Sequence, residues 1–363
     1  AMSGMNSTMF NLVNNMVGTG MNRAANSRKA DMATAPALDL LDIAGYNYAS
    51  GRYPLEAKAH PKRVIMGSET FPQDIAKNWK MVKEYPYLIG DFMWTAWDYL
   101  GEAGLGEWAY TPDGKGFNKS YPWLLADCGA LDILGNPNGE LYLAQAAWGM
   151  LDNQPVIAVQ PVNHPGTKPA KMVWRGTNAQ PGWSYRGCEG NKAVVEVYSG
   201  QPVVELFLNG KSLGKKKVKN CRVVYKTKYL PGELKAAAYN EAGQLQGEST
   251  LVSAAGTLQI QVTADKTTVK PGELIYLDVR LTDKNGVVEA NADTTLTATV
   301  KGGELLGFGS ANPRTEERFQ AGKYTTYYGL AQAVVRSGKS GTVTVSIHGD
   351  GLKTAIAEII CKE

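Results

Sequence analysis

The sequence is poor in the residues that build metal sites and disulfide frameworks. It contains 3 histidines and 4 cysteines among 363 residues, and no two cysteines form a CxxC pair. Zinc sites of the common spacings need closely placed cysteine and histidine ligands, so we expect no metal and no cofactor. Isolated cysteines most often serve as small buried hydrophobes. Cys188 and Cys221 fall in one predicted domain, and their pairing in an oxidising compartment is left open.

Strong charge and long apolar runs are missing too. The net charge of +4 is too small to argue for binding to nucleic acid or to an anionic membrane. No apolar run approaches the roughly 20 residues of a spanning helix. No secretory leader is visible in this sequence, and the opening residues AMSG leave open that a native leader is absent from it. One basic run stands out, and we interpret it as a solvated strand or turn, with an anion-binding patch as the alternative. It consists of Lys215, Lys216, Lys217 and Lys219.

Residues 1–152 alternate between strand and helix patterns. Strand–helix alternation predicts a parallel sheet. The expected strands cover 40–48, 63–69 and 88–94, and the expected helices cover 9–17, 72–84 and 137–151. The stretch 98–136 is rich in Gly, Trp, Tyr and Pro, and it predicts a long loop above the sheet.

Beyond Pro155 the pattern changes to short β-rich runs with a turn signal about every ten residues. Residues 208–211 (LNGK) form a strong hairpin signal. This spacing predicts two all-β sandwiches, over 153–255 and 256–363. The sequence PGEL occurs at 231–234 and again at 271–274, and we interpret it as the same turn chemistry used twice.

One carboxylate stands at the end of a predicted buried strand. The apolar residues Val64, Ile65 and Met66 lead through two small residues to Glu69. An acid at the C-terminal end of a barrel strand is typically catalytic. The alternative is a structural acid near the start of the helix that begins at Pro72.

Three motifs around this strand resemble, in order and spacing, the last strands of the catalytic barrel of glycoside hydrolase family 2. They are 41–48 (LDIAGYNY), 66–70 (MGSET) and 90–102 (GDFMWTAWDYLGE). The tail is similar to that of the β-galactosidases of Bacteroides-type bacteria: 204–214 resembles a sandwich domain that follows the barrel, and the segment from Leu258, with 307–313 (GFGSANP), resembles a terminal invasin-like domain. The resemblance therefore implies the C-terminal half of a (β/α)8 TIM barrel, followed by two immunoglobulin-like sandwiches.

The activity implied by the resemblance is that of a retaining β-glycosidase, which hydrolyses terminal β-linked sugars through a covalent glycosyl-enzyme intermediate. Glu69 would be the nucleophile, Asn47 and Tyr48 would lie beside it, and Trp94 would form part of the sugar platform. A carboxylate nucleophile stays ionised when donors such as a Tyr hydroxyl or an Asn amide surround it. The expected partner is a carbohydrate, with β-glucuronidase and β-mannosidase specificity as alternatives to β-galactosidase.

Other acids in this region have several interpretations. Asp91 and Asp98 can contact a sugar hydroxyl, cap a helix or pair with an arginine such as Arg52. We interpret Glu102 and Glu107 as solvated loop acids, with a role in a sugar subsite as the alternative.

Further aromatic residues have two interpretations as well. Trp97 is three residues beyond Trp94 and is expected to pack in the core. We interpret Trp174, Trp183 and Tyr185 as inter-domain packing, with a carbohydrate-binding face as the alternative.

The first 152 residues are too few for a complete barrel, which needs about 250 residues and eight strands. In the family the general acid/base is a glutamate that follows an asparagine on an earlier strand. The Asn-Glu pair of this chain, Asn240-Glu241, lies in a predicted turn of the first sandwich and does not fit that role. We therefore expect a fragment that lacks the acid/base and is nearly inactive alone.

Two further expectations follow from the half-barrel. An open sheet edge favours self-association. A non-catalytic carbohydrate-binding or structural module is the competing class of function. The resemblance implies a periplasmic or secreted location, and a cytoplasmic one is left open.

Overall fold

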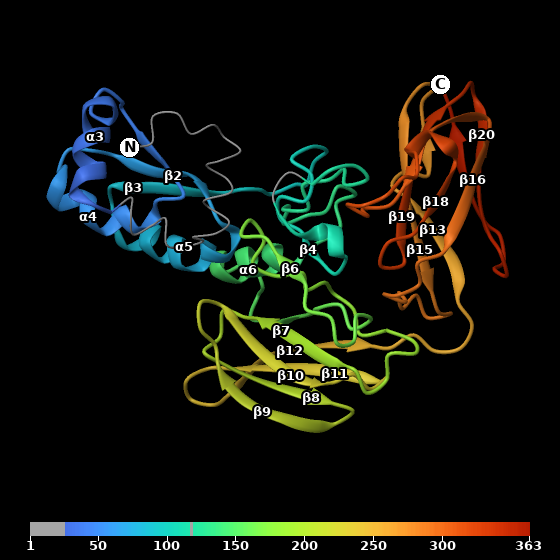
Figure 1. Ribbon diagram of the computed structural model, residues 1–363. Coiled ribbons are helices and arrows are strands. Elements are labelled where there is room, and N and C mark those ends of the chain that lie inside the picture. The colour runs from blue at the N-terminus through green and yellow to red at the C-terminus, as the bar shows by residue number, and fades with distance from the viewer. Residues whose placement is uncertain (1–25, 117–118) are drawn as a thin grey trace.

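The computed structural model describes residues 26–116 and 119–363, and it is mostly β sheet with few helices (Figure 1). Figure 1 shows three groups of elements: a small parallel sheet with helices, a β unit below it, and a second β unit at the C-terminal end. The helix expected over 9–17 lies outside the described residues. No helix in the described part of the chain is long and apolar enough to cross a membrane.

The first group is a three-stranded parallel sheet in the order β1-β2-β3. Its strands are β1 (Ala44–Asn47), β2 (Ile65–Thr70) and β3 (Leu88–Met93), and the helices near it are α3 (Arg28–Leu38), α4 (Tyr53–Ala59), α5 (Ile75–Glu84) and α6 (Gly139–Trp148). All three expected strands and the helices expected over 72–84 and 137–151 are present. Because the strands are parallel, their carboxyl ends lie along one edge of the sheet.

Helix α3 has no counterpart among the helices expected from the sequence. None of its residues is buried, and Pro36 lies inside it. It begins at a cap in which the Ser27 side chain accepts a hydrogen bond from the Ala30 N–H (3.2 Å). A helix without a buried apolar face leaves no periodic pattern in the sequence.

The segment between β3 and α6 is an extended loop, as the sequence predicts. Its regular elements are the short strand β4 (Trp108–Ala109) and one 3₁₀ turn, η4 (Pro112–Gly114). Strand β4 pairs with β6 (Ala170–Lys171), which lies about sixty residues further along the chain. This pairing folds the middle of the loop against the start of the next unit.

The second group consists of two antiparallel sheets that share one apolar core. One sheet has the order β10-β7-β5, with β5 (Val156–Val159), β7 (Lys192–Tyr198) and β10 (Arg222–Lys228); the other has the order β12-β11-β8-β9, with β8 (Val203–Leu208), β9 (Lys211–Lys217), β11 (Glu233–Tyr239) and β12 (Leu245–Val252). Side chains of both sheets, such as Val195 and Leu206, belong to the same buried cluster. The β8–β9 hairpin turns at Asn209 and Gly210, whose φ angles of 49° and 76° are those of a tight hairpin turn.

The third group also consists of two sheets around one core. The first has the order β13-β15-β19-β17, with β13 (Gln259–Ala264), β15 (Leu274–Thr282), β17 (Gly303–Gly309) and β19 (Leu330–Ser337); the second has the order β14-β21-β20-β16-β18, with β14 (Thr268–Val269), β16 (Thr295–Lys301), β18 (Lys323–Thr325), β20 (Gly341–Gly349) and β21 (Ala355–Cys361). Leu277 of β15 and Val345 of β20 are both fully buried in this core.

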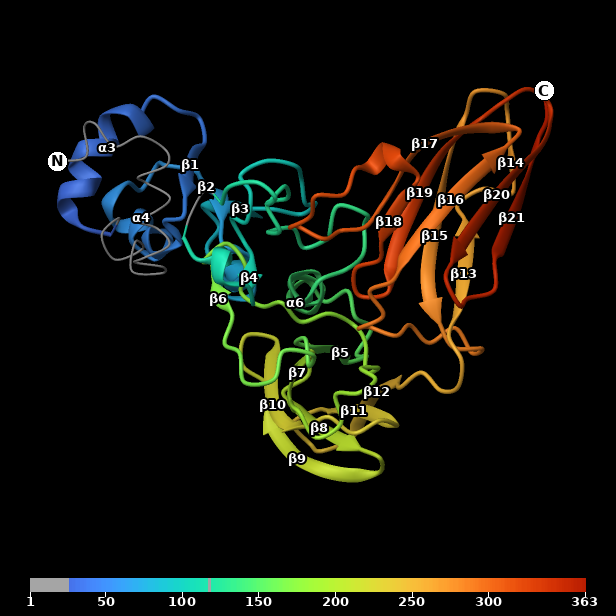
Figure 2. The same cartoon turned by 45° about the vertical axis from the view of Figure 1, so that its right-hand side comes forward.

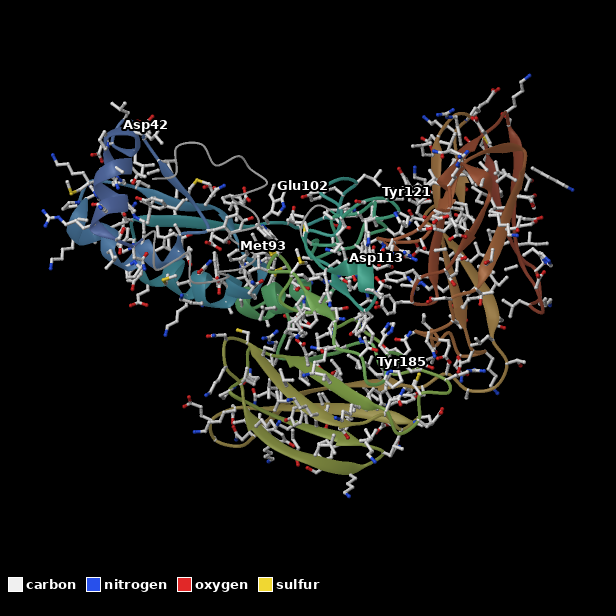
Figure 3. The ribbon with its side chains drawn as sticks, viewed as in Figure 1. Asp42, Met93, Glu102, Asp113, Tyr121 and Tyr185 are labelled. Carbon is white, nitrogen blue, oxygen red and sulfur yellow. The ribbon has the colours of Figure 1, made fainter. Side chains whose placement is uncertain are left out.

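The long loop after β3 contacts the C-terminal unit across about two hundred residues of sequence. Figure 3 shows Asp113 and Tyr121 on the side of the loop that is turned toward this unit, and the two parts lie side by side in Figure 2 as well. Leu124 donates its N–H to the Pro313 carbonyl (2.8 Å). Arg314 pairs with Asp113 (Nε to Oδ2, 2.7 Å). The C-terminal unit therefore supports the loop that lies beyond β3.

All four cysteines are free thiols. Cys188 lies in the core of the second group, whereas Cys221 packs against a different cluster, which includes Ile75 of α5 and Leu143 of α6. The two cysteines therefore do not pair. The lysines of β9 are solvated, as expected.

The parallel sheet has two outer strands, since β1 and β3 each pair with β2 alone among the described residues. Large apolar side chains near these strands are exposed, including Leu40 (86%) and Phe92 (58%). Exposed apolar surface at an open sheet edge favours association, so self-association through this edge remains a prediction.

Candidate functional site

Strand register brings Glu69 to two donors at the carboxyl end of the sheet. Asn47 of β1 lies opposite Glu69 of β2 in the parallel ladder. The Asn47 amide donates to Glu69 Oε2 (2.9 Å), and the Tyr48 hydroxyl donates to Glu69 Oε1 (2.5 Å). Three of the four residues that the sequence singles out are therefore in direct contact.

The backbone at Tyr48 allows this contact. Tyr48 has a left-handed φ of 52°, and its N–H donates to the Glu69 carbonyl (2.7 Å). Such a conformation is uncommon for a residue other than glycine and costs conformational energy. The strand therefore ends on a turn that points the phenol back toward the carboxylate.

A tryptophan from beyond the first 152 residues completes this arrangement. Trp174 donates its indole N–H to the Tyr48 hydroxyl (2.8 Å), and its ring packs edge-on against Tyr48 and Phe71. The Tyr48 hydroxyl therefore accepts from Trp174 and donates to Glu69. Burial, and then the bond to Glu69, raise the pKa of Tyr48 far above its usual value. The phenol thus stays protonated and acts as a permanent donor.

The three aromatic residues of the second unit are buried and do not form a carbohydrate-binding face. Trp174 is 2% exposed, and Trp183 and Tyr185 are each 1% exposed. Trp183 and Tyr185 pack around Tyr229 inside the unit. Trp174 instead makes the packing contact to the first group, and the 126 residues between it and Tyr48 explain why no local pattern predicts their hydrogen bond.

Trp94 lies next to this group, at the end of β3. Its N–H donates to the carbonyl of Thr70, the residue after Glu69 (2.9 Å). Its indole N–H donates to the Tyr99 hydroxyl (3.2 Å), and Tyr99 in turn donates to Glu102. Trp97 is 54% exposed, so the expectation that it packs in the core is wrong.

Asp91 is a structural acid beneath the site. It accepts hydrogen bonds from Tyr53 (2.9 Å), Thr70 (2.9 Å) and Asn78 (3.2 Å). Burial raises its pKa, although these three bonds lower it. Arg52 does not pair with Asp91, because it contacts Asp31 and Glu56 instead.

Glu102 and Glu107 differ in their surroundings. Glu102 is exposed, as expected, whereas Glu107 is only 8% exposed. The expectation of a solvated acid is therefore wrong for Glu107, because the β4–β6 pairing draws this part of the loop against the second unit. Burial, and then the nearby Asp127 carboxylate, raise the pKa of Glu107 well above its usual value.

Asp98 is buried in the same loop and is expected to make the stability of the chain depend on pH. Its Oδ1 accepts the Cys128 N–H (3.1 Å). Burial, and then the charge of Asp127, raise the pKa of Asp98 to about 7. The unfolded chain ionises near pH 4, so the folded state loses stability relative to it as the pH rises from about 4 to about 7.

Replacing Asp98 with Asn is expected to remove part of this loss, on the order of 1–3 kcal/mol, because the amide keeps the acceptor and carries no charge. Urea unfolding at pH 5 and pH 8 measures how much stability each protein loses between these two pH values. Asp113→Asn is the matched control, since the pKa of Asp113 is lowered to about 2 and it does not titrate in this window. An equal loss in the wild type and in Asp98→Asn would contradict the assignment.

Among the described residues, no second carboxylate takes part in the hydrogen bonds of Glu69. Within residues 26–116 and 119–363, the side chains that donate to its carboxylate are Asn47 and Tyr48. Asn240-Glu241 lies in the turn between β11 and β12, as expected. In the described part of the chain, no cluster of three or more His, Cys, Asp or Glu side chains is placed to hold a metal ion.

Two family descriptions match the sequence of the β units. Residues 259–358 match the glycoside hydrolase family 2 C-terminal domain 5, and residues 190–246 match a domain of unknown function, DUF4982. Both matches lie in the region predicted to form the two all-β sandwiches.

Two curated relatives are similar to longer stretches of the chain. Beta-galactosidase BoGH2A of Bacteroides ovatus is 29% identical over 292 residues, which are 78% of this chain and 30% of that protein. A putative beta-glucuronidase of Formosa agariphila is 32% identical over 142 residues, which are 39% of this chain and 10% of that protein.

Solved structures of family 2 glycosyl hydrolases are similar over nearly the whole chain. A family 2 glycosyl hydrolase of Bacteroides cellulosilyticus superimposes with a TM-score of 0.80 and 36% identity, and the match covers 93% of this chain and 44% of that one. The chain thus spans less than half the length of these relatives.

Proposed function

We propose that Glu69 is the nucleophile of a retaining β-glycosidase. The chain belongs to glycoside hydrolase family 2 and corresponds to the C-terminal part of proteins of that family. The parallel sheet would be the last part of a (β/α)8 barrel, and the units over 153–255 and 256–363 would be immunoglobulin-like sandwiches. A periplasmic or secreted location belongs to the same proposal. The observation that carries it is the Glu69 carboxylate, which stands at the carboxyl end of a parallel strand with two donors bound to it.

In the proposed reaction, a Glu69 oxygen attacks the anomeric carbon of a terminal β-linked sugar. The new carbon–oxygen bond forms as the glycosidic bond breaks, and water later hydrolyses the glycosyl ester. Asn47 and Tyr48 hold the carboxylate in place by hydrogen bonds, and the face of Trp94 supports the pyranose ring.

The departing oxygen needs a proton, and no residue of this chain is assigned as its donor. A positioned acid contributes roughly 10²–10⁴-fold. We therefore propose that the chain alone hydrolyses nitrophenyl glycosides very slowly.

A mechanism-based trap tests the nucleophile without the missing acid. Dinitrophenolate is a leaving group that needs no protonation. A fluorine at carbon 2 of the sugar slows both the formation and the hydrolysis of the glycosyl-enzyme, because both steps pass through a positively charged sugar. Incubation with 2,4-dinitrophenyl 2-deoxy-2-fluoro-β-D-galactoside is expected to leave one fluorosugar on Glu69, which peptide mass spectrometry locates. A label on another residue, or none at saturating probe, would overturn the proposal.

The identity of the sugar is proposed from sequence similarity alone. β-Galactoside specificity rests on the similarity to the Bacteroides ovatus protein, and β-glucuronide specificity on the similarity to the Formosa agariphila protein. The corresponding fluoro-glucuronide probe distinguishes them by its rate of labelling.

Removing the Tyr48 hydroxyl is expected to slow labelling. A hydrogen bond to a charged group is worth about 1.5–3 kcal/mol, so Tyr48→Phe is expected to lower the labelling rate by roughly 10- to 100-fold. Tyr46→Phe is the matched control, since Tyr46 lies two residues earlier and its hydroxyl accepts from Arg63 (3.0 Å). Equal rates for the two variants would show that the Tyr48 hydroxyl does not assist Glu69.

A further inference from the structure

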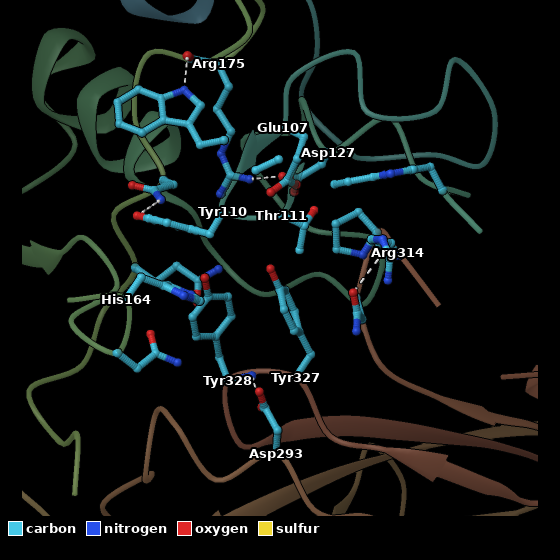
Figure 4. A pocket seen from close by; sticks show the side chains of 18 residues that line it. Glu107, Tyr110, Thr111, Asp127, His164, Arg175, Asp293, Arg314, Tyr327 and Tyr328 are labelled. Atoms are coloured by element: carbon cyan, nitrogen blue, oxygen red, sulfur yellow. Dashed lines mark hydrogen bonds and ion pairs between the residues drawn. The ribbon is translucent and has the colours of Figure 1, made fainter. Parts of the chain in front are cut away.

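A polar cavity lies where three parts of the chain meet. It has a volume of about 250 Å³, and Glu69, Asn47, Tyr48 and Trp94 are not among the residues that line it. In Figure 4 its walls come from the loop after β3, the segments on either side of β6 and the C-terminal unit. Side chains that face it include Glu107, Tyr110, His164, Arg175, Tyr327 and Tyr328.

Three oxygens in these walls have no hydrogen-bond partner among the described residues: Glu107 Oε2, Asn163 Oδ1 and Asn178 Oδ1. Glu107 is 8% exposed and Asn178 is 5% exposed. A buried acceptor left unpaired costs about 1–3 kcal/mol. A ligand that brings several hydroxyl donors would therefore be favoured here.

The charged groups of the cavity are mostly neutralised within the protein. Arg175 pairs with Asp127 (2.5 Å), and Arg314 pairs with Asp113. Burial, and then the charge of Asp127, raise the pKa of Glu107 well above its usual value, which favours the uncharged form of this carboxyl. Walls of this kind favour a neutral ligand over an anion, because both arginines that line the cavity are already paired. The exception among the charged groups is Asp293, whose carboxylate makes no ion pair within the described residues.

Asp293 is the acid on the C-terminal wall. Its Oδ1 accepts the Tyr328 N–H (3.1 Å), and burial raises its pKa to about 6. Asp293 is therefore ionised at neutral pH, and an experiment must test whether its negative charge attracts a cationic ligand to the cavity.

Aromatic rings supply the apolar part of the walls. Tyr110 and His164 are stacked with ring centroids 3.8 Å apart, and Tyr327 and Tyr328 are tilted with centroids 4.4 Å apart. The volume is slightly below the roughly 300–1,000 Å³ of pockets for drug-sized ligands, which suits one sugar ring rather than a chain. We propose that this junction cavity binds a single neutral monosaccharide, separately from the site at Glu69.

Calorimetric titration of the purified chain with D-galactose and D-glucose tests the proposal. Saturable binding of at least one sugar is expected, weakened tenfold or more by Asn163→Leu and by Asn178→Leu, which remove an unpaired acceptor. Asn163 is only half-buried, so Asn163→Leu is the variant with the lower risk to folding. Trp94→Ala is the control: it removes the proposed platform beside Glu69 and is expected to leave this binding unchanged.

Three results would overturn the proposal. The first is the absence of saturable binding by either sugar. The second is binding that is lost in Trp94→Ala and kept in Asn163→Leu. The third is binding of D-glucosamine at least tenfold tighter than D-glucose and dependent on Asp293, tested with Asp293→Asn, which would assign the cavity to a cation. None of these results depends on whether the fluorosugar labels Glu69.

Discussion

Replacing Glu69 with Gln is expected to abolish covalent labelling by the fluorogalactoside. The amide retains the size of the side chain but lacks the ionised oxygen that attacks the anomeric carbon. It can still accept from Tyr48 (2.5 Å in the wild type), so the local structure is expected to survive. Intact-mass spectrometry is the measurement, with the wild type labelled in parallel.

A control substitution at another acidic residue distinguishes the loss of the nucleophile from a general effect of removing a negative charge. Glu102→Gln is suitable, because Glu102 is an exposed acid bound by Tyr99 in the loop that follows Trp94. This variant is expected to label at close to the wild-type rate. Labelling of Glu69→Gln at the wild-type rate would show that another residue attacks the sugar.

Replacing Arg175 with Met is expected to destabilise the chain by about 3–5 kcal/mol, the cost of leaving a buried charge without its partner. Arg175 is 5% exposed and pairs with Asp127. It also donates to the Thr177 carbonyl (2.8 Å) and to Asn138 Oδ1 (3.0 Å). Burial lowers the pKa of Arg175, but Asp127 and the other buried acids raise it more, so the guanidinium remains charged.

Urea unfolding measures this loss. Arg314→Met is the matched control, since it breaks an Arg–Asp pair whose side chains are 41% and 42% exposed, and such pairs contribute roughly 0–1 kcal/mol. Adding Asp127→Asn to Arg175→Met is expected to recover part of the stability. Asn tolerates the left-handed backbone found at Asp127 (φ 52°), and it removes the unpaired charge. Equal losses for the two arginine variants would contradict the buried role of Arg175.

Local pattern was sufficient for most of the elements near the candidate site. The apolar run before Glu69 predicts β2, which spans Ile65–Thr70. The Asn-Gly signal predicts the β8–β9 hairpin. These features depend on residues close in sequence, so period and turn chemistry are enough to find them. Helix α3 was missed because it buries no residue.

The environment of each acid was harder to predict. Glu107 lies in the long loop and was expected in solvent, but strand pairing of β4 with β6 buries it. Trp97 was expected in the core and is exposed instead. Burial of a loop residue depends on which distant segment packs over it, and a single sequence carries little information on that choice.

The sequence by itself determined the strand that carries Glu69, the alternation that makes the first sheet parallel, the β character of the rest, and the resemblance to family 2. The tertiary structure alone decided that Trp174 donates to Tyr48, that Arg175 pairs with Asp127, and that three parts of the chain line a polar cavity. The physical reason is the separation of the interacting residues along the sequence. Strand and turn patterns arise from neighbouring residues, whereas these contacts join side chains as far as two hundred residues apart.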